Sequence, residues 1–310
     1  MRIIFFGTPD FAVPSLKALM DSGNEVCAVV TQPDRLKGRG HQLSQPPVKV
    51  FALSLGIPVL QPASVRTASF LSELTALRPE AIVVVAYGRI IPPGILSLPP
   101  RGCINVHGSL LPKYRGAAPI QWAIINGEER TGITTMLMDE GLDTGDVLLK
   151  DETVILDDDT TESLSRRLSG IGAALLLRTL DGLADGSVRP LPQTGLPSYA
   201  PPLKKELGKI DWSRSSSSIT SLIRGVYPWP GAYGYLNGER VGIISAKAAD
   251  ETAAGKAGQI IRINSAGMLV ATGQGLLSVS EVKPEGRKPM AAAAFARGRH
   301  LLEGACFDAL

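Results

Sequence analysis

Short apolar runs alternate with helix-like segments through the first two-thirds of the chain. The runs end at Gly or at polar residues and predict buried strands over 2–6, 25–31, 81–87 and 103–107. Apolar residues at helical spacing predict helices over about 14–21, 48–55, 118–126 and 161–183. This β-α-β order is typical of a parallel sheet covered by helices, so we expect an α/β fold.

Two segments interrupt this alternation. Residues 32–47 show no apolar periodicity, which predicts a long exposed loop. Residues 190–202 (PLPQTGLPSYAPP) hold five prolines, and proline disfavours both helix and sheet. We therefore expect an extended, semi-rigid linker over 190–206, between a first domain at 1–189 and a second at 207–310.

The second domain has a different pattern. After a helix predicted at about 215–226, short apolar segments are separated by Gly, Asn and Asp. These segments lie at 232–236, 241–246, 259–263, 267–272 and 276–282. Short strands at this spacing predict a small β-barrel.

Charge distinguishes the two predicted domains. The 310 residues carry a net charge of +3, which does not by itself mark a nucleic-acid-binding protein. Residues 1–206 have 20 Lys and Arg against 21 Asp and Glu, whereas residues 207–310 have 12 against 8. The cationic surplus therefore lies in the second domain.

Cysteine spacing and hydropathy exclude several classes of protein. Cys27, Cys103 and Cys306 lie far apart without CxxC spacing, which supports neither a disulfide framework nor a zinc site, so no metal is expected. The first apolar run is too short for a signal peptide, and no run of about 18 apolar residues occurs. We expect a soluble cytoplasmic protein that does not bind membranes.

Candidate chemistry lies at the end of the strand predicted over 103–107. Side chains alternate between the two faces of a strand, so Asn105 and His107 share one face. Ligands of open α/β sheets bind beyond the carboxyl ends of the strands, where His107 precedes a glycine turn. A histidine can take a proton from an attacking amine and return it, and an Asn amide can donate to an oxyanion. The pair is typical of acyl transfer.

A carboxylate that orients the imidazole is expected in MDEGLDTGD (138–146), and Asp143 between two glycines is the candidate. Each of these residues also has an alternative interpretation. His107 taken singly could be a hydrogen-bonded core residue, and the acidic segment could be a solvated turn or a cation loop. Cys103 is a possible nucleophile, although a small buried hydrophobic residue is the simpler interpretation.

Several motifs occur together in an order that marks one family. They are GTPDFA, TQPDR followed by GRG, VVVAYGRI, NVHGSLLPKYRGAAPI, GLDTGD, YAP, IDW and YPWPGA. The chain resembles the methionyl-tRNA formyltransferases almost end to end, and NVHGSLLPKYRG with GLDTGD marks the wider folate-dependent formyltransferase group. The resemblance implies a Rossmann-like formyltransferase domain followed by an OB-like, tRNA-binding β-barrel. It also implies that Asn105, His107 and Asp143 are the catalytic residues.

The resemblance further implies two substrates and a monomer. A formyl group would move from N10 of 10-formyltetrahydrofolate, a co-substrate, to the amino group of initiator methionyl-tRNA, giving N-formylmethionyl-tRNA for translation initiation without a metal. The residues implied for the reduced-folate pocket are Ser109, Leu110, Leu111, Pro112, Tyr87, Gly88, Arg89 and Ile90. The residues implied for the tRNA acceptor end are Arg35, Lys37 and Arg39.

Three other functions fit parts of the pattern. A formyltransferase acting on a nucleotide amino sugar and a formyltetrahydrofolate hydrolase would share the catalytic residues, but neither accounts for the basic loop. A noncatalytic RNA-binding module would leave Asn105, His107 and Asp143 without a role.

Overall fold

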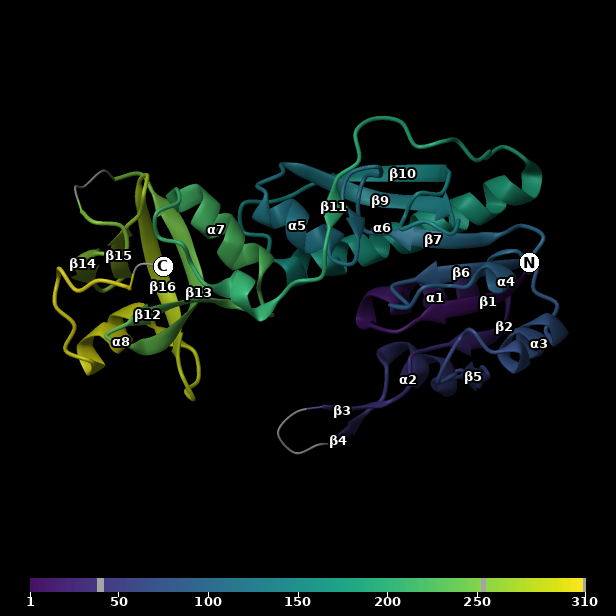
Figure 1. Cartoon of the computed structure of the whole chain (residues 1–310), viewed down its shortest axis with the longest axis horizontal. Coiled ribbons are helices and arrows are strands. Elements are labelled where there is room, and N and C mark those ends of the chain that lie inside the picture. Colours follow the sequence, from purple (N-terminus) through teal and green to yellow (C-terminus); the bar gives the residue numbers. More distant parts are fainter. Residues whose placement is uncertain (38–41, 252–254, 309–310) are drawn as a thin grey trace. The chain divides into compact units, whose positions relative to one another are not determined.

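The computed structural model describes residues 1–37, 42–251 and 255–308. The chain forms two compact units, whose elements are labelled in Figure 1. The first comprises Met1–Pro119, Arg130–Val154 and Ser165–Ala200, and the second comprises Ile120–Glu129, Ile155–Leu164 and Pro201–Leu310. Each unit therefore draws on more than one stretch of the sequence.

A seven-stranded sheet forms the centre of the first unit, in the order β10-β9-β7-β6-β1-β2-β5. Its strands are β1 Arg2–Gly7, β2 Glu25–Val30, β5 Val59–Leu60, β6 Ala81–Val85, β7 Cys103–His107, β9 Arg130–Leu137 and β10 Val147–Val154. The strands from β7 to β5 in this order run parallel to one another. This arrangement confirms the α/β fold.

The β-α-β order does not hold throughout the sheet. β9 runs antiparallel to β7, and β10 runs antiparallel to β9. Residues 138–146 join β9 to β10, and so short a connection cannot make the crossover that a parallel pair needs. The expectation of a parallel sheet was therefore wrong at this edge.

Helices cover the faces of the sheet. They are α1 Val13–Asp21, α2 Pro47–Ser54, α3 Ala68–Ala76, α4 Pro93–Leu96 and α6 Thr161–Asp185, of which the part from Ser165 belongs to this unit. α6 lies so close to β7 that a Cβ added at Gly172 would be 3.0 Å from the Val106 side chain. Cys103, on the other face of β7, belongs to a buried hydrophobic cluster that includes Phe70 of α3 and Ile95 of α4. Among the described helices, none is both long and apolar enough to span a membrane.

Sequence reasoning misses several short elements, among them β5 and α3. α3 has a readable start, because the hydroxyl of Thr67 accepts a hydrogen bond from the Phe70 N–H at 3.3 Å and caps the helix. Only Phe70 and Leu74 of this helix are buried. Two buried positions are too few to produce a clear helical period.

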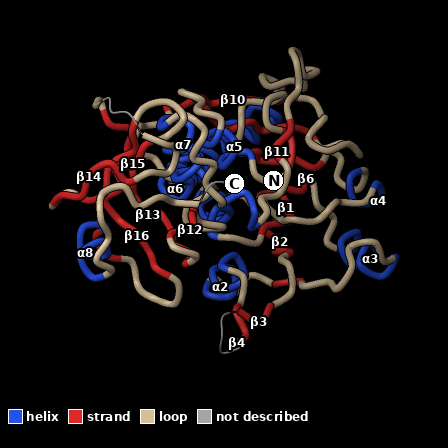
Figure 2. Tube along the Cα trace, turned by 60° about the vertical axis from the view of Figure 1, so that its left-hand side comes forward, coloured by secondary structure: helices blue, strands red, loops and turns tan. Residues whose placement is uncertain are grey.

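Two segments expected to be irregular contain paired backbone. Within 32–47, β3 Arg35–Lys37 and β4 Gln42–Ser44 form an antiparallel hairpin, which extends beyond α2 in Figure 2. Within 190–202, β11 Tyr199–Ala200 pairs in parallel with β8 Arg115–Gly116. The expectation of irregular chain was wrong in both places, because strands of two or three residues are too short to leave an apolar period.

The second unit is built on an antiparallel sheet in the order β12-β13-β16-β15-β14, with β17 paired to β16. Its strands are β12 Ala232–Leu236, β13 Glu239–Ala249, β14 Ile260–Asn264, β15 Gly267–Ala271, β16 Leu276–Pro284 and β17 Met290–Ala291. Its helices are α5 Pro119–Ile125, α7 Ser216–Gly225 and α8 Ala292–Gly298, with a 3₁₀ turn at Lys205–Gly208.

The C-terminal segment joins the two outer strands of this sheet. Leu236 of β12 pairs with Phe307, and Gln259, which precedes β14, pairs with Cys306. The Phe307 N–H donates to the carbonyl of Gly258 at 2.8 Å. The backbone pairing thus continues from one edge to the other, which gives the domain the expected barrel-like form.

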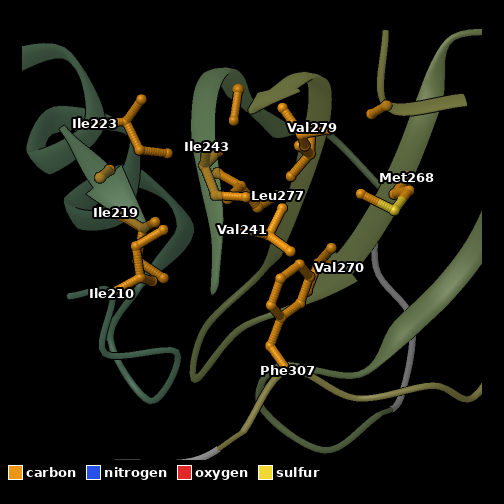
Figure 3. Close-up of a cluster of buried hydrophobic side chains, with 14 of the residues drawn as sticks. Ile210, Ile219, Ile223, Val241, Ile243, Met268, Val270, Leu277, Val279 and Phe307 are labelled. Atoms are coloured by element: carbon orange, nitrogen blue, oxygen red, sulfur yellow. The ribbon is translucent and has the colours of Figure 1, made fainter. Parts of the chain in front are cut away.

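Figure 3 shows the core of this barrel-like sheet. Ile219 and Ile223 of α7 lie opposite Ile243 on the sheet, and Phe307 enters the same cluster from the C-terminal segment. Phe307 is fully buried and stacks on Trp212, with ring centroids 4.7 Å apart. The residue that closes the barrel is therefore also part of its core.

We expect Phe307→Ala to destabilise the second unit by about 3–5 kcal/mol, the usual cost of removing a large side chain from a packed core. All 3 tryptophans, Trp122, Trp212 and Trp229, lie in this unit, so tryptophan fluorescence during urea unfolding reports on it. Leu302→Ala, at a residue that is 76% exposed, is the control. Equal unfolding midpoints for the two variants would contradict the closing role of Phe307.

Burial raises the pKa of the Cys103 thiol to about 12, which argues against a nucleophilic role because the thiol stays protonated near neutral pH. We expect iodoacetamide at about pH 8 to alkylate the exposed Cys306 of the native protein and to spare Cys103. In urea, Cys103 should react as well. Peptide mass spectrometry measures both states, and rapid alkylation of Cys103 in the native state would refute this expectation.

Candidate active site

β7 presents Asn105 and His107 on one face of the first unit's sheet. The strand lies between β6 and β9, where Asn105 is opposite Val84 and His107 is opposite Thr134. Asn105 is 9% exposed and His107 is 5% exposed. Because β6 and β7 are parallel, their carboxyl ends lie at the same edge, where α/β sheets bind their ligands.

The segment 138–146 places Asp143 against this face of β7. Its backbone adopts the left-handed conformation with φ 52°, which Asp tolerates better than most residues. The Asn105 Nδ2 donates to Asp143 Oδ1 at 3.4 Å. Asp143 Oδ2 lies 3.6 Å from His107 Nδ1. The structure therefore brings together the three side chains singled out from the sequence.

Short internal contacts fix the rest of this acidic loop. The Thr144 hydroxyl and the Gly141 N–H donate to Asp139 Oδ1 at 2.7 and 3.0 Å. A Cβ at Gly145 would lie 1.8 Å from the carbonyl oxygen of Leu137, so only glycine fits this close approach. The Asp139 carboxylate is used inside the loop, whereas that of Asp143 faces the imidazole.

A backbone carbonyl orients the imidazole of His107. Its Nε2 lies 3.0 Å from the carbonyl oxygen of Tyr114. A carbonyl oxygen only accepts hydrogen bonds, so Nε2 carries the proton in the neutral ring and Nδ1 keeps its lone pair. The distance from Nδ1 to Asp143 exceeds a hydrogen bond. Tyr114 thus orients the ring, and Asp143 is placed to stabilise its charged form.

The same stretch of backbone also holds the carboxylate. The Gly116 N–H donates to Asp143 Oδ2 at 2.8 Å. Gly116 has φ 125°, and a Cβ there would lie 2.7 Å from the carbonyl oxygen of Ala200. The Tyr114 N–H donates to the hydroxyl of Ser198 at 2.9 Å. Residues 198–200 therefore fix the backbone of residues 114–116, which positions both His107 and Asp143.

These groups suit proton transfer coupled to attack on a carbonyl group. Nδ1 of His107 faces the Asp143 carboxylate at 3.6 Å and can take a proton from an attacking group, because Nε2 is the nitrogen that donates to Tyr114. The amide of Asn105 can donate to an oxygen that becomes negative. Low exposure strengthens both interactions because little water screens them.

The expected folate residues at Tyr87 and Gly88 follow the end of β6. Tyr87 is buried and packs edge-on against Phe6, with ring centroids 5.1 Å apart. Burial raises the pKa of its hydroxyl, which has no hydrogen-bond partner among the described residues. Gly88 has φ 79°, and a Cβ there would lie 2.5 Å from the side chain of Gln32. The turn after β6 therefore requires glycine.

Arg89 and the 71% exposed Ile90 line a cavity of about 330 Å³. The other lining residues are Ala63, Ser64, Val65 and Arg66. Arg89 Nη1 donates to the carbonyls of Pro62 and Ala63 at 3.1 and 2.9 Å, which fixes the guanidinium. Two guanidinium groups beside a serine hydroxyl suit a carboxylate ligand.

Residues Ser109, Leu110, Leu111 and Pro112 form a fixed turn after β7. The Ser109 hydroxyl is buried and donates to the carbonyl of Lys113 at 2.6 Å. The Leu111 N–H donates to the hydroxyl of Thr134 at 3.1 Å. Leu111 is buried, whereas Leu110 and Pro112 are half-buried. Contact of this turn with folate stays a prediction.

The basic residues Arg35 and Lys37 lie in β3, whereas Arg39 lies outside the described residues. Arg35 is exposed and lines a cavity of about 410 Å³. Thr8, Pro9, Gln32, Pro33, Ser44, Gln45, Pro46, Pro47 and Ala86 complete its lining. The hydrogen bond from Lys49 Nζ, at 2.7 Å, holds the pKa of Asp34 below its usual value and fixes the base of the hairpin.

Sequence reasoning misses three groups that complete the site. Two are the carbonyl of Tyr114 and the N–H of Gly116, which are backbone groups that no side-chain pattern marks. The third is Gln193, whose Nε2 donates to the carbonyl of Asp143 at 2.8 Å. Gln193 lies in the proline-rich segment, and no local signal distinguishes it from a solvated linker residue.

Comparisons with known proteins cover both units of the chain. Residues 1–180 match the family model described as "Formyl transferase", and residues 202–300 match "Formyl transferase, C-terminal domain". The chain is 52% identical to the "Methionyl-tRNA formyltransferase" of Thermodesulfovibrio yellowstonii, covering 97% of each chain. It is 51% identical to the protein of that name from Pelotomaculum thermopropionicum, covering 98% of this chain and 97% of the relative.

Solved structures share the fold at low sequence identity. One is WlaRD, a sugar 3N-formyl transferase crystallised with dTDP and 5-N-formyl-THF, at 19% identity, a TM-score of 0.68, and coverage of 93% of this chain and 99% of that one. Another is HypX from Aquifex aeolicus with tetrahydrofolic acid, at 19% identity and a TM-score of 0.66; the match covers 96% of this chain but only 47% of HypX. From the family matches over both units and the close relatives along nearly the whole length, the chain belongs to the formyl transferase family.

Proposed function

We propose that the chain transfers a formyl group from N10 of 10-formyltetrahydrofolate to the α-amino group of initiator methionyl-tRNA. The observation that carries the proposal is the grouping of Asn105, His107 and Asp143. In this grouping Asn105 supplies a donor for the oxyanion, His107 a base, and Asp143 a charge partner for the imidazole. The choice of acceptor is supported by the relatives at 51–52% identity, which are named methionyl-tRNA formyltransferases.

Each step of the transfer has a group positioned for it. The amine nitrogen attacks the formyl carbon, and His107 Nδ1 takes the proton that the amine loses. The formyl oxygen becomes negative and accepts a hydrogen bond from Asn105 Nδ2, while Asp143 stabilises the charged imidazole. When the bond from the formyl carbon to N10 breaks, the imidazole returns its proton to N10. The products are the formylated amine and tetrahydrofolate, and His107 regains its neutral form.

The cavity at Arg66 and Arg89 supports a position for the tail of the folate. The glutamate tail of 10-formyltetrahydrofolate carries two carboxylates, which guanidinium groups bind through charge-assisted hydrogen bonds. Ile90 adds an exposed apolar surface beside this cavity. The turns at 87–90 and 109–112 follow neighbouring strands, β6 and β7, and would lie along the folate between its tail and its N10.

The tRNA would meet the hairpin of β3 and β4 and the part of the second unit formed by residues 207–310. Arg35 is exposed, and Arg35 and Lys37 give β3 two cations. Residues 207–310 carry 12 basic against 8 acidic side chains, a surplus that favours phosphate contacts. A sugar nucleotide and water are smaller acceptors that need neither feature. A noncatalytic RNA-binding module would not account for the buried triplet.

Radiolabelled formyl transfer tests the choice of acceptor. With 10-formyltetrahydrofolate as donor, we expect the label in initiator methionyl-tRNA, and neither in a nucleotide amino sugar nor as free formate. His107→Ala is the control and should lose at least about 100-fold in rate, because general base catalysis contributes that much. Formylation of the amino sugar without formylation of methionyl-tRNA would refute the proposal, and so would rapid formate release.

Arg89→Ala and Arg66→Ala test the position of the folate tail. Losing one charge-assisted hydrogen bond costs about 1.5–3 kcal/mol, so each variant should raise the KM for 10-formyltetrahydrofolate roughly 10-fold or more. The kcat and the KM for methionyl-tRNA should stay near those of the unaltered protein. Arg178→Ala removes the same charge from an exposed ion pair with Asp151 and serves as the control. An unchanged KM for folate in both variants would place the tail elsewhere.

A further inference from the structure

The proline-rich segment before Ala200 is attached to the first unit along its length. Leu191 exchanges two backbone hydrogen bonds with Val147, at 2.8 and 2.9 Å. Further along, the Arg115 N–H donates to the carbonyl of Ser198 at 2.8 Å. Gln193 lies between these two attachments. The segment is therefore a strap across the site, defined here as residues 191–200, and not a free linker.

Gln193 uses its whole amide group within this strap. Its Nε2 donates to the carbonyls of Asp143 and Gly145 at 2.8 and 2.9 Å. Its Oε1 accepts from Arg115 Nε and Nη2 at 3.1 and 2.7 Å. An amide offers two donor hydrogens and two acceptor lone pairs, so the hydrogen-bonding capacity of Gln193 is complete. Such a fully paired amide has one preferred orientation, and it fixes the position of Arg115 relative to the carbonyls of Asp143 and Gly145.

The contacts of Gln193 and Gly116 form a closed circuit around Asp143. The backbone carbonyl of Asp143 is bound by Gln193, which is bound by Arg115. Gly116, the next residue after Arg115, binds the Asp143 carboxylate. Backbone and side chain of Asp143 are therefore both tied to the same strand, β8. Tyr114, on the other side of Arg115, binds the imidazole of His107.

This circuit matters because it holds the backbone of Asp143, whereas the contacts with Asn105 and His107 involve only its carboxylate. The residue has a left-handed backbone, which is unfavourable for an L-amino acid and persists only where surrounding contacts impose it. The neighbouring Leu142 is 60% exposed and offers no packing anchor. The two carbonyls that Gln193 binds lie on either side of Thr144. Removing their donor would free the loop to relax and to draw the carboxylate away from His107.

We propose that Gln193 is a positioning residue for the formyl transfer, which acts through Asp143 and does not touch either substrate. The inference rests on the proposed function for its kinetic readout. Gln193→Met keeps the length of the side chain and removes all four hydrogen bonds. We expect kcat to fall by roughly 10- to 100-fold, the scale of a misplacement of about 1 Å at a catalytic group. The KM values for folate and for methionyl-tRNA should change by less than about 2-fold, because ground-state binding does not use Asp143.

A double-variant cycle separates positioning from general structural damage. If Gln193 acts through Asp143, then Asp143→Ala combined with Gln193→Met should be no slower than Asp143→Ala, within about 2-fold. Multiplying losses would overturn the inference, and so would a kcat of Gln193→Met within about 2-fold of the unaltered protein. Leu196→Ala is the control, because Leu196 lies in the same strap and is 90% exposed.

Hydrogen–deuterium exchange tests, without any assay of activity, whether Gln193 holds the loop 138–146 in place. In Gln193→Met the amides of 138–146 should exchange faster than in Leu196→Ala, whereas those of β1 and β6 should not change. Equal exchange of the loop in the two variants would overturn the inference even if kcat falls. If the unaltered protein did not formylate methionyl-tRNA, the proposed function would fail, and the exchange result would still decide whether Gln193 holds the loop.

Discussion

Asp143 must be held against the imidazole of His107 by a loop that crosses the face of β7, and the first unit meets this requirement with backbone groups. The carbonyl of Tyr114 fixes one nitrogen of the ring, and the N–H of Gly116 fixes one oxygen of the carboxylate. Both come from a single short stretch of chain, so ring and carboxylate share one frame. A small movement of that stretch would displace both together and largely preserve their separation.

The sheet explains why this frame is rigid. β7 is enclosed by β6 on one side and β9 on the other, and its Ile104 and Val106 face α6 while its Cys103 faces α3 and α4. Such a strand is strongly fixed in register, because a slip by one residue would turn Asn105 and His107 toward α6 and move Ile104 and Val106 to the opposite face. The alternation that buries the apolar residues thereby also fixes Asn105 and His107 beside each other.

The second unit depends on a different constraint, which is the pairing of the two edge strands of its sheet. Its antiparallel sheet would leave two unpaired edges, and the C-terminal segment covers both by pairing with β12 and with the residue before β14. Phe307 then ties this segment to the core through Trp212. The candidate active site and the closure of the second unit's sheet are thus built from different elements: β7 and the loop 138–146 form the former, and the C-terminal segment forms the latter.

The local sequence pattern was sufficient to predict the longer strands of the first unit and the proximity of Asn105 and His107 on β7. The apolar runs identified β1, β2, β6 and β7 to within two residues, and strand alternation placed Asn105 beside His107. These features depend on neighbours within a few positions, which the sequence displays directly. The glycines around Asp143 marked a tight loop for the same reason, and the position between them singled out Asp143 as the candidate carboxylate.

Tertiary structure decided what depends on distant partners. The reversed direction of β9, the hairpin of β3 and β4, and the pairing of β8 with β11 leave no period in the sequence because each involves few residues or a remote strand. Gln193 is 50 positions from Asp143 and 78 from Arg115 along the chain. Apolar periodicity indicates which face of a helix or strand is buried, but it does not indicate which residues pack against that face. The partners of His107 and Asp143 are therefore set only when the chain has folded.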